Sequence, residues 1–224
     1  MDACAFTLSG ETLFARASGA LWWPAGRLLC VSDLHLGKCE RIARRSGNML
    51  PPYETQDTLL RLQSEIEALD PARVVCLGDS FDDLDAAASL PEAERLWLLR
   101  LQAGRRWIWI EGNHDPGPVE FGGTHLAELP LPPLTFRHIA RKGEAGEVSG
   151  HYHPKACLSL RGRMVSRPCF LHDSDRVILP AFGTYTGGLR WDDPALAGLM
   201  RREATAVLTG PMAHALPMPR RALT

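Results

Sequence analysis

Three strongly apolar runs, each ending abruptly in polar residues, constrain the fold of this chain more than any other feature. They are "RLLCVSDLH" at 27–35, "RVVCLGDSFDD" at 73–83 and "RRWIWIEGNHD" at 105–115. A short apolar run that stops at polar residues is typical of a buried strand followed by a turn. We therefore predict three buried strands, each followed by a polar turn.

The segments between these runs have helical patterns. In "ETQDTLLRLQSEIEALD" apolar residues recur at intervals of three and four, and Pro71 follows, which indicates an amphipathic helix and its end. "PEAERLWLLRLQAG" begins at Pro91 and closes at Gly104, as helices often do. Alternating strands and helices predict a parallel sheet with right-handed crossovers. The three polar turns then lie together beyond the carboxyl ends of the strands.

After residue 125 the pattern changes to short apolar or alternating segments broken by Gly and Pro, such as "LTFRHI", "GEVSGHYH" and "RVILPAFG". These segments predict the strands of a second, more antiparallel sheet. The whole is an α/β chain with a single domain over 1–209. The segment 210–224, rich in Pro and Gly, is expected to be a poorly ordered tail.

Charge and composition narrow the function classes. Lys and Arg total 25 against 26 Asp and Glu, so bulk charge does not favour DNA binding, and any phosphate-bearing substrate needs a local site. The start of the chain does not resemble a secretory signal, and no apolar stretch is long enough to span a bilayer. Six cysteines without a C-x-x-C pair indicate reduced thiols. We expect a cytoplasmic protein that does not bind membranes.

The polar turns offer metal-ligand chemistry, although each has a simpler explanation. Asp33 and His35 alternate along the chain and can face one side of an extended segment, or they can be an ordinary turn. Asp79 follows Gly78, where a carboxylate can bridge two cations, or it belongs to a solvated acidic loop with the aspartates that follow it.

The third turn and a later histidine pair extend this set. Asn113 supplies a neutral oxygen ligand, His114 can donate a proton and Asp115 can orient its ring, while a plain turn is the alternative. His151 and His153 alternate across one residue and can face the same way, and imidazole is a common ligand of Zn and Fe. A pair of histidines at this spacing is weak support by itself.

The four motifs together, D-x-H, G-D-x-x-D, G-N-H-D and G-H-x-H, in this order and each after a predicted strand, resemble the calcineurin-like metallophosphoesterase superfamily. The match spans roughly residues 28–154. The resemblance implies a four-layer α/β-β/α sandwich, in which two facing mixed β-sheets are flanked by helices and a two-metal site lies at the strand ends. It agrees with the layout predicted above.

The resemblance also implies roles for individual residues. One metal is held by Asp33, His35 and His153; the other is held by Asn113, His151 and one further histidine; Asp79 bridges the two. His114 acts near the leaving group, with Asp115 behind it. For the further histidine we choose His138, which ends an apolar run, over His125, which follows two glycines. We expect His172 and His214 to be surface or packing residues.

Two cations suit the hydrolysis of an anionic phosphate ester, because they lower the pKa of a water, neutralise phosphoryl oxygens and orient an in-line attack. Mixed oxygen and imidazole ligands favour divalent transition metals. We expect two such ions, with Mn preferred and Fe or Zn as alternatives.

Further stretches resemble one bacterial branch, the ligase-associated DNA-damage-response endonucleases. They are "LWWP" at 21–24, "DLHLGK" at 33–38, "LPPYET" at 50–55, "GDSF" at 78–81 and "LPAFGTYTGGL" at 179–189. This resemblance implies an endonuclease or phosphodiesterase acting on DNA in repair, in association with an ATP-dependent DNA ligase, a helicase and an exonuclease.

Direct support for a nucleic-acid substrate comes from a basic stretch after the D-x-H turn. Its cations, which can hold a phosphate backbone or simply form a solvated helix face, are Lys38, Arg41, Arg44 and Arg45. Tyr185 can stack on a base or belong to a structural turn. Two other functions stay open: a small-molecule phosphomonoesterase or nucleotide pyrophosphohydrolase, and a catalytically inert scaffold on the same fold.

Overall fold

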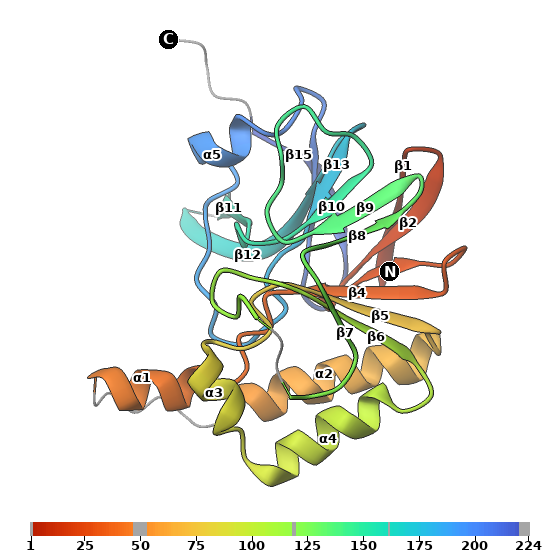
Figure 1. The fold of residues 1–224 in the computed structure, drawn as a ribbon. Helices are drawn as coiled ribbons and strands as arrows, with labels where there is room; N and C mark the ends of the chain where they lie inside the picture. The colour runs from red at the N-terminus through yellow and green to blue at the C-terminus, as the bar shows by residue number, and fades with distance from the viewer. Residues whose placement is uncertain (1, 47–52, 118–119, 161, 220–224) are drawn as a thin grey trace.

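Two β-sheets packed face to face form the centre of the protein (Figure 1). The computed structural model describes residues 2–46, 53–117, 120–160 and 162–219. Its strands are β1 (Ala3–Leu8), β2 (Glu11–Arg16), β3 (Leu21–Trp23), β4 (Leu28–Ser32), β5 (Arg73–Leu77), β6 (Arg106–Ile110), β7 (Thr124–Leu126), β8 (Glu128–Leu131), β9 (Leu134–Arg137), β10 (Glu147–Ser149), β11 (Lys155–Leu160), β12 (Arg163–His172), β13 (Arg176–Ile178), β14 (Thr205–Leu208) and β15 (His214–Pro217). Its helices are α1 (Lys38–Ser46), α2 (Glu54–Leu69), α3 (Leu84–Ala88), α4 (Glu92–Gln102) and α5 (Pro194–Ala197).

The first sheet contains the three predicted strands. Its order is β1-β2-β3-β4-β5-β6-β7, with β4 to β7 parallel and β1 to β4 antiparallel. β4, β5 and β6 are apolar on both faces because one face meets helices and the other meets the second sheet. The parallel sheet is therefore confirmed, whereas the antiparallel strands before β4 were not predicted.

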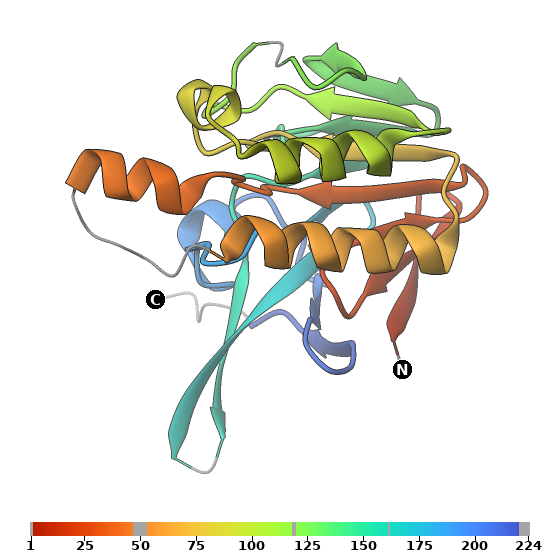
Figure 2. The ribbon, with the colours of Figure 1, turned by 90° about the horizontal axis from the view of Figure 1, so that it is seen from below.

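The two predicted helices, α2 and α4, cover the outer face of the first sheet (Figure 2). Leu59, Leu62 and Ile66 of α2 are buried against this face, as their spacing requires. α2 ends with Asp70 in the left-handed conformation, one residue before Pro71. The helix boundaries thus follow the stop signals in the sequence.

The second sheet packs on the other face of the first. Its main path is β15-β14-β12-β13-β10-β9-β8, and β11 lies off this path, paired with β12. A cluster of buried apolar side chains from both sheets fills the space between them. On its outer face lies a thinner layer, in which Leu196 of α5 and Trp191 pack on the sheet. The predicted sandwich of two mixed sheets flanked by helices is confirmed, with a short helix and loops as its fourth layer.

The registers bring the predicted turns to one edge. Ser32, Leu77 and Ile110 end their strands level with one another, because Ser32 pairs with Leu77 and Leu77 with Ile110. In the second sheet, β9 and β10 are also parallel, and the amide of Gly150 donates to the carbonyl of His138 at 3.0 Å. The turns after these five strands therefore meet where the carboxyl edges of the two sheets adjoin.

One expectation for the end of the chain is not met. His214–Pro217 is the edge strand β15, which pairs with β14 through four residue pairs. Pairing along the edge of β14 explains a strand where Pro and Gly suggested a tail. Residues 220–224 of the expected tail lie outside the described residues. Within the described part of the chain, no helix has the length and apolar character needed to cross a membrane.

Candidate metal centre

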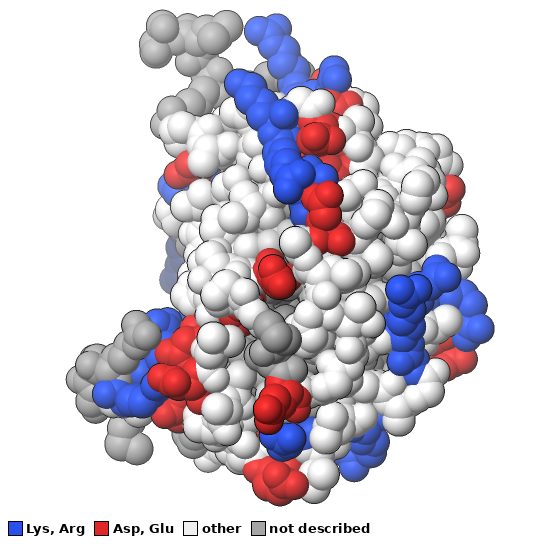
Figure 3. Space-filling view, viewed as in Figure 1, with Lys and Arg blue, Asp and Glu red and all other residues white. Residues whose placement is uncertain are grey.

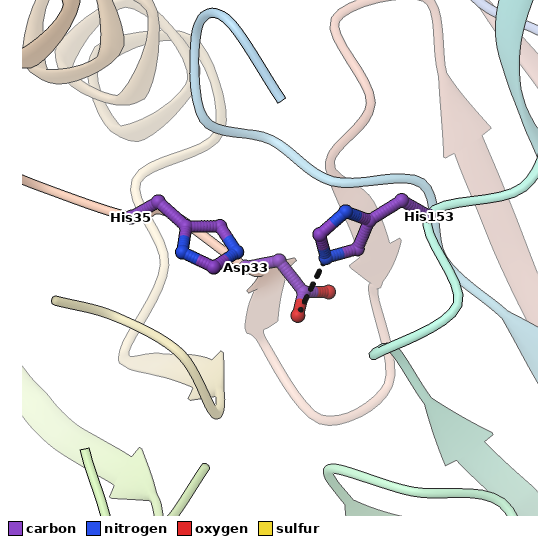
Figure 4. A group of neighbouring side chains, drawn as sticks. All are labelled: Asp33, His35 and His153. Carbon is purple, nitrogen blue, oxygen red and sulfur yellow. Dashed lines mark ion pairs between the residues drawn. The ribbon is translucent and has the colours of Figure 1, made fainter. Parts of the chain in front are cut away.

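The first group of possible ligands contains Asp33, His35 and His153 (Figure 4). One ligand atom from each lies within 4.8 Å of the others, and His153 Nε2 is 3.1 Å from Asp33 Oδ1. Asp33 and His35 follow β4, while His153 follows β10 of the other sheet. The two sheets thus contribute to one group.

The second group contains Asp79, His138 and His151, with ligand atoms also within 4.8 Å of one another. His138 Nε2 lies 3.4 Å from Asp79 Oδ2, 3.2 Å from His151 Nδ1 and 3.1 Å from Asn113 Oδ1. The groups adjoin, since His138 Nδ1 is 3.9 Å from Asp33 Oδ1. All seven predicted ligands are therefore brought together at the junction of the sheets.

The surroundings of these atoms suit metal ions. Asp33 Oδ1, His35 Nε2 and His153 Nε2 are buried, and apart from the 3.1 Å ion pair between Asp33 Oδ1 and His153 Nε2 they have no hydrogen-bond partner among the described residues. A buried polar atom without a partner is costly, and three that converge call for an ion.

The surroundings of His138 also suit a metal ion in the second group. Its Nδ1 donates to the carbonyl of Leu77 at 2.9 Å. In the neutral ring Nε2 therefore carries no proton, and its lone pair faces oxygens of Asp79 and Asn113. Converging electron pairs repel one another unless a proton or a cation lies between them. Both groups therefore fit divalent metal ions.

Each aspartate has one oxygen fixed by the backbone and one facing its group. Asp33 Oδ2 accepts from the amide of His151 at 3.0 Å and from the hydroxyl of Ser32, which leaves Oδ1 for the site. Asp79 Oδ1 accepts from the amide of His114 at 2.8 Å, which leaves Oδ2 towards His138. Such contacts orient carboxylate ligands before a metal binds.

The pKa shifts favour the ligand forms of Asp33, Asp79 and His151. For His138, in contrast, burial opposes protonation, but the carboxylates of Asp79 and Asp33 outweigh it and raise the pKa. Burial opposes ionisation of Asp33 and Asp79, but His153 beside Asp33 and His138 beside Asp79 outweigh it and hold both pKa values below their ordinary range. Burial, followed by the charge of His138, lowers the pKa of His151. Ionised carboxylates and a neutral imidazole are the forms that bind metals.

The backbone at the site is strained. Five of the candidate ligands adopt positive φ although none is glycine, and each such residue costs on the order of 1–3 kcal/mol. They are Asp33 (φ 52°), His35 (φ 46°), Asp79 (φ 43°), His151 (φ 70°) and His153 (φ 46°). The prediction that the D-x-H and H-x-H pairs alternate along extended strands is therefore wrong, because both pairs lie in left-handed turns beyond the strand ends.

Two glycines allow the turns to approach closely. A Cβ on Gly150 would lie 1.7 Å from the Ser32 hydroxyl oxygen, and one on Gly112 would lie 2.1 Å from the Asp79 nitrogen. The glycines before G-H-x-H and G-N-H-D are thus required by contacts between the turns rather than by their own conformation.

The sequence analysis gave no role to Asp82, the last residue of G-D-x-x-D. Its Oδ1 accepts from His35 Nδ1 at 2.8 Å, so His35 presents Nε2 to the first group. A carboxylate behind a ligand histidine fixes its tautomer and ring orientation. The second aspartate of the motif could have indicated this role. It is one of four aspartates that lie close together in the sequence, so the pattern alone did not distinguish it.

His114 and Asp115 are placed differently from each other. His114 lies beside the first group and forms a third group of possible ligands with His35 and Asp82. Its ring is 5.1 Å from that of His35, and its Nδ1 is 2.9 Å from the Asp82 carbonyl oxygen. Asp115 makes no described contact with that ring. Its carboxylate accepts from the amides of Ser80, Phe81 and Gly112, and burial raises its pKa to about 6. Asp115 therefore joins two strand-end turns instead of orienting His114.

The basic residues expected to hold substrate are largely paired inside the protein. Arg41 forms an ion pair with Asp82, and Lys38 Nζ lies 4.0 Å from the same carboxylate. Arg44 pairs with Asp83, Asp85 and Glu40. Figure 3 shows acidic and basic side chains intermingled at the lower left, over α1 and α3. Arg45 belongs to α1, but its side chain lies outside the described part of the structure.

The remaining predicted residues have simple positions. Tyr185 is exposed, at φ 59°, in the segment between β13 and α5. His125 stacks on Trp109 at 6.3 Å, and His172 stacks on Phe6 at 4.2 Å. His214 is exposed on β15. None of these three histidines belongs to the described metal-ligand groups, so His138 is the better choice of further histidine.

Two surface hollows flank the site. One, of about 390 Å³, is lined by Asn113 and His138 together with Ile139 and Arg141. The other, of about 370 Å³, is lined by His151, Tyr152, His153, Gly188 and Leu189. Both contain candidate ligands, so a substrate bound at the metals has two separate hollows to extend into.

Comparison with known proteins agrees with this geometry. The family model of the calcineurin-like phosphoesterase matches residues 26–188. The crystal structure of Pseudomonas putida nuclease MPE is similar at 29% identity, covering 96% of this chain and 100% of that chain with a TM-score of 0.77. A predicted phosphoesterase from Streptococcus pneumoniae TIGR4 is 12% identical over 85% of this chain and 96% of its own, with a TM-score of 0.28, which does not establish a shared fold.

No curated protein matches the chain significantly. The family model nevertheless covers most of the chain, and the two groups of ligands lie within the matched residues. The TM-score of 0.77 shows that this chain shares its fold with the similar nuclease, and its two facing sheets with helices outside agree with the resemblance of the four motifs. The chain therefore belongs to the calcineurin-like phosphoesterase family and is a metal-dependent phosphoesterase.

Proposed function

We propose that this enzyme is a nuclease that hydrolyses phosphodiester bonds in DNA. The family supplies the metal-dependent phosphoesterase chemistry, and the similar Pseudomonas putida protein is a nuclease. The observation that carries the proposal is the convergence of unpartnered ligand atoms from Asp33, His35 and His153 beside the group around His138.

Seven side chains would hold the metals. Asp33, His35 and His153 form one ligand set, Asn113, His138 and His151 form the other, and Asp79 between them serves both. Two divalent ions bound there would lower the pKa of a water, neutralise phosphoryl oxygens and favour in-line attack. The mixed carboxylate, amide and imidazole ligands favour Mn, with Fe and Zn as the alternatives.

The chain's own residues would orient the reaction and move a proton. Nδ1 of His114 faces the carbonyl oxygen of Asp82 at 2.9 Å, so its Nε2 is the nitrogen available to the substrate. With a second proton on Nε2, His114 would donate that proton to the leaving oxygen or stabilise its charge. Asp82 would keep His35 in its ligand tautomer.

The hollows on both sides of the site favour a diester. A phosphomonoesterase or nucleotide pyrophosphohydrolase needs a pocket that grips a terminal phosphate, whereas a polymer continues beyond the scissile bond on both sides. Here one hollow adjoins Asn113 and His138, and the other adjoins His151 and His153. Both ends of a bound diester therefore have room.

The test compares two small substrates with the same leaving group and one polymer. The purified enzyme with manganese should hydrolyse bis-para-nitrophenyl phosphate faster than para-nitrophenyl phosphate, and it should cleave a fluorescent DNA oligonucleotide. A strong preference for the monoester, with intact DNA, would instead establish the phosphomonoesterase. No hydrolysis with manganese, iron or zinc would favour the inert scaffold.

The cellular role follows from the resemblance of five short stretches to ligase-associated endonucleases. We place the enzyme in the cytoplasm, acting in DNA repair with an ATP-dependent DNA ligase, a helicase and an exonuclease. Cells lacking the gene should lose viability after DNA damage, and an Asp79→Asn copy should fail to restore it. Full rescue by that copy would contradict a role for the nuclease activity in repair.

A further inference from the structure

The structure assigns a second functional element, an arm formed by β11 and the first half of β12, which we propose binds the nucleic-acid backbone beside the metal centre. This inference rests on the proposed nuclease function and extends it to a substrate surface. The arm begins at Lys155, two residues after His153. Figure 2 shows it projecting from the body as a twisted two-stranded ribbon.

Ala156 and Leu158 at the base of the arm pack in the apolar layer outside the second sheet, and beyond them the arm stands apart from the sheet. Six residue pairs join Lys155–Leu160 to Arg163–Pro168, whereas only Cys169–His172 of β12 pairs with β14. Six pairs at about 3.3 Å each give a ribbon roughly 20 Å long. A two-stranded ribbon of this kind can enter a groove of duplex DNA.

The Lys and Arg side chains of the arm's sequence are not balanced by any Asp or Glu. From Pro154 to His172 the sequence contains Lys155, Arg161, Arg163 and Arg167 but no Asp or Glu. Arg163 and Arg167 are exposed, and no carboxylate of the described residues pairs with either. Arg41 and Arg44 on α1, in contrast, are paired with aspartates. Acidic or basic side chains would equally prevent an exposed edge strand from pairing with another chain. Because the charged residues here are all basic, we infer an anionic partner.

The spacing of these cations suits a phosphate backbone. Arg163 and Arg167 are four residues apart on one strand, so both side chains leave the same face, roughly 13 Å apart. That distance is close to the axial rise of four nucleotides at about 3.4 Å each. Met164 leaves the opposite face near the tip and is 66% exposed, which leaves an apolar group to contact sugars or bases.

The base of the arm is tied to the metal centre. Pro154 accepts a hydrogen bond from the amide of Cys169 at 2.9 Å, and Lys155 Nζ donates to the carbonyl of Thr186 at 2.9 Å. The hollow lined by His151, His153 and Gly188 lies where the arm begins. A nucleic acid that enters this hollow therefore has the arm beside it.

The test uses the double variant Arg163→Gln/Arg167→Gln in the full chain with manganese. We measure kcat/KM for a fluorescent oligonucleotide and for bis-para-nitrophenyl phosphate. The ratio of the two should fall about tenfold at low salt, and the slope of log kcat/KM for DNA against log salt should flatten by about 1.5, because two phosphate contacts are lost. Single-stranded and duplex oligonucleotides run in parallel distinguish the form that the arm binds.

Arg100→Gln/Arg106→Gln is the matched control. Both arginines are exposed and unpaired with described carboxylates, and they lie near the amino end of β6, away from the metals. This variant makes the same change in net charge and should leave the ratio and the salt slope unchanged. An unchanged ratio in the arm variant, or an equal fall in both variants, would overturn the role of the arm. A wild-type enzyme that hydrolyses the small diester but not DNA would overturn the proposed nuclease itself.

Discussion

The half of the site built by Asp33, His35 and His153 differs from the half around His138 in what holds its imidazoles. In the first half, His35 is anchored by the Asp82 side chain at 2.8 Å. In the second, His138 is anchored by the main-chain carbonyl of Leu77 at 2.9 Å. A side-chain anchor can be removed by substitution and a main-chain anchor cannot, so the halves should respond differently to mutation.

Asp79→Asn should have the largest effect, because we propose that Asp79 serves both metal ions. One oxygen accepts from the His114 amide and the other faces His138 at 3.4 Å. The substitution keeps the shape but removes the charge shared by both ions, so kcat on bis-para-nitrophenyl phosphate should fall by about 10³-fold or more. Circular dichroism should show an intact fold. A fall of less than tenfold would mean that Asp79 does not serve both halves.

His114→Ala should come next, since His114 lies beside the site without belonging to either half. Loss of a general acid typically lowers the rate by about 10²–10⁴-fold. Metal content, measured by mass spectrometry, should equal that of the wild-type enzyme, and a substrate with a better leaving group should recover part of the rate. Loss of a metal ion in this variant would make His114 a ligand.

Asp82→Asn should weaken one half only. Without its carboxylate, His35 loses the anchor of its tautomer, and the affinity for one of two manganese ions should fall by about 10–100-fold. Calorimetric titration should then show one site with its wild-type affinity and one weakened site. Equal weakening of both sites would show that the two halves are not anchored separately.

Arg44→Gln should have the smallest effect. Arg44 is paired with Asp83 and Asp85 on the outside of α1, and exposed pairs contribute little to stability. Its kcat/KM on DNA should stay within about twofold of wild type, since a neutralised cation attracts little phosphate. A fall in kcat/KM as large as that of the arm variant would show that α1 contributes to substrate binding.

The sequence predicted the centre of the fold well because apolar runs and helical spacing are local signals. β4, β5, β6, α2 and α4 all lie where these signals placed them. The antiparallel strands before β4 and the edge strand β15 were not predicted, because their partners are distant or their segments contain turn-forming residues.

For the site, the motifs predicted which residues converge but not how. The pairs D-x-H and H-x-H reach the site through positive φ, which no alternation rule anticipates. Asp82 and the paired state of Arg41 depend on a contact between α1 and the acidic loop. A run of basic residues in a sequence does not show whether its charge is paired: Arg41 is paired with Asp82, whereas Arg163 and Arg167 of the arm pair with no carboxylate of the described residues.

The central claim is that two metal ions bind in two separate halves joined by Asp79. The most direct measurement is anomalous diffraction from crystals of the wild-type enzyme grown with manganese. We predict two peaks about 3.5–4 Å apart, one beside Asp33, His35 and His153 and the other beside Asn113, His138 and His151, with Asp79 contacting both. A single peak contacted by both His151 and His153, or no peak, would contradict the account.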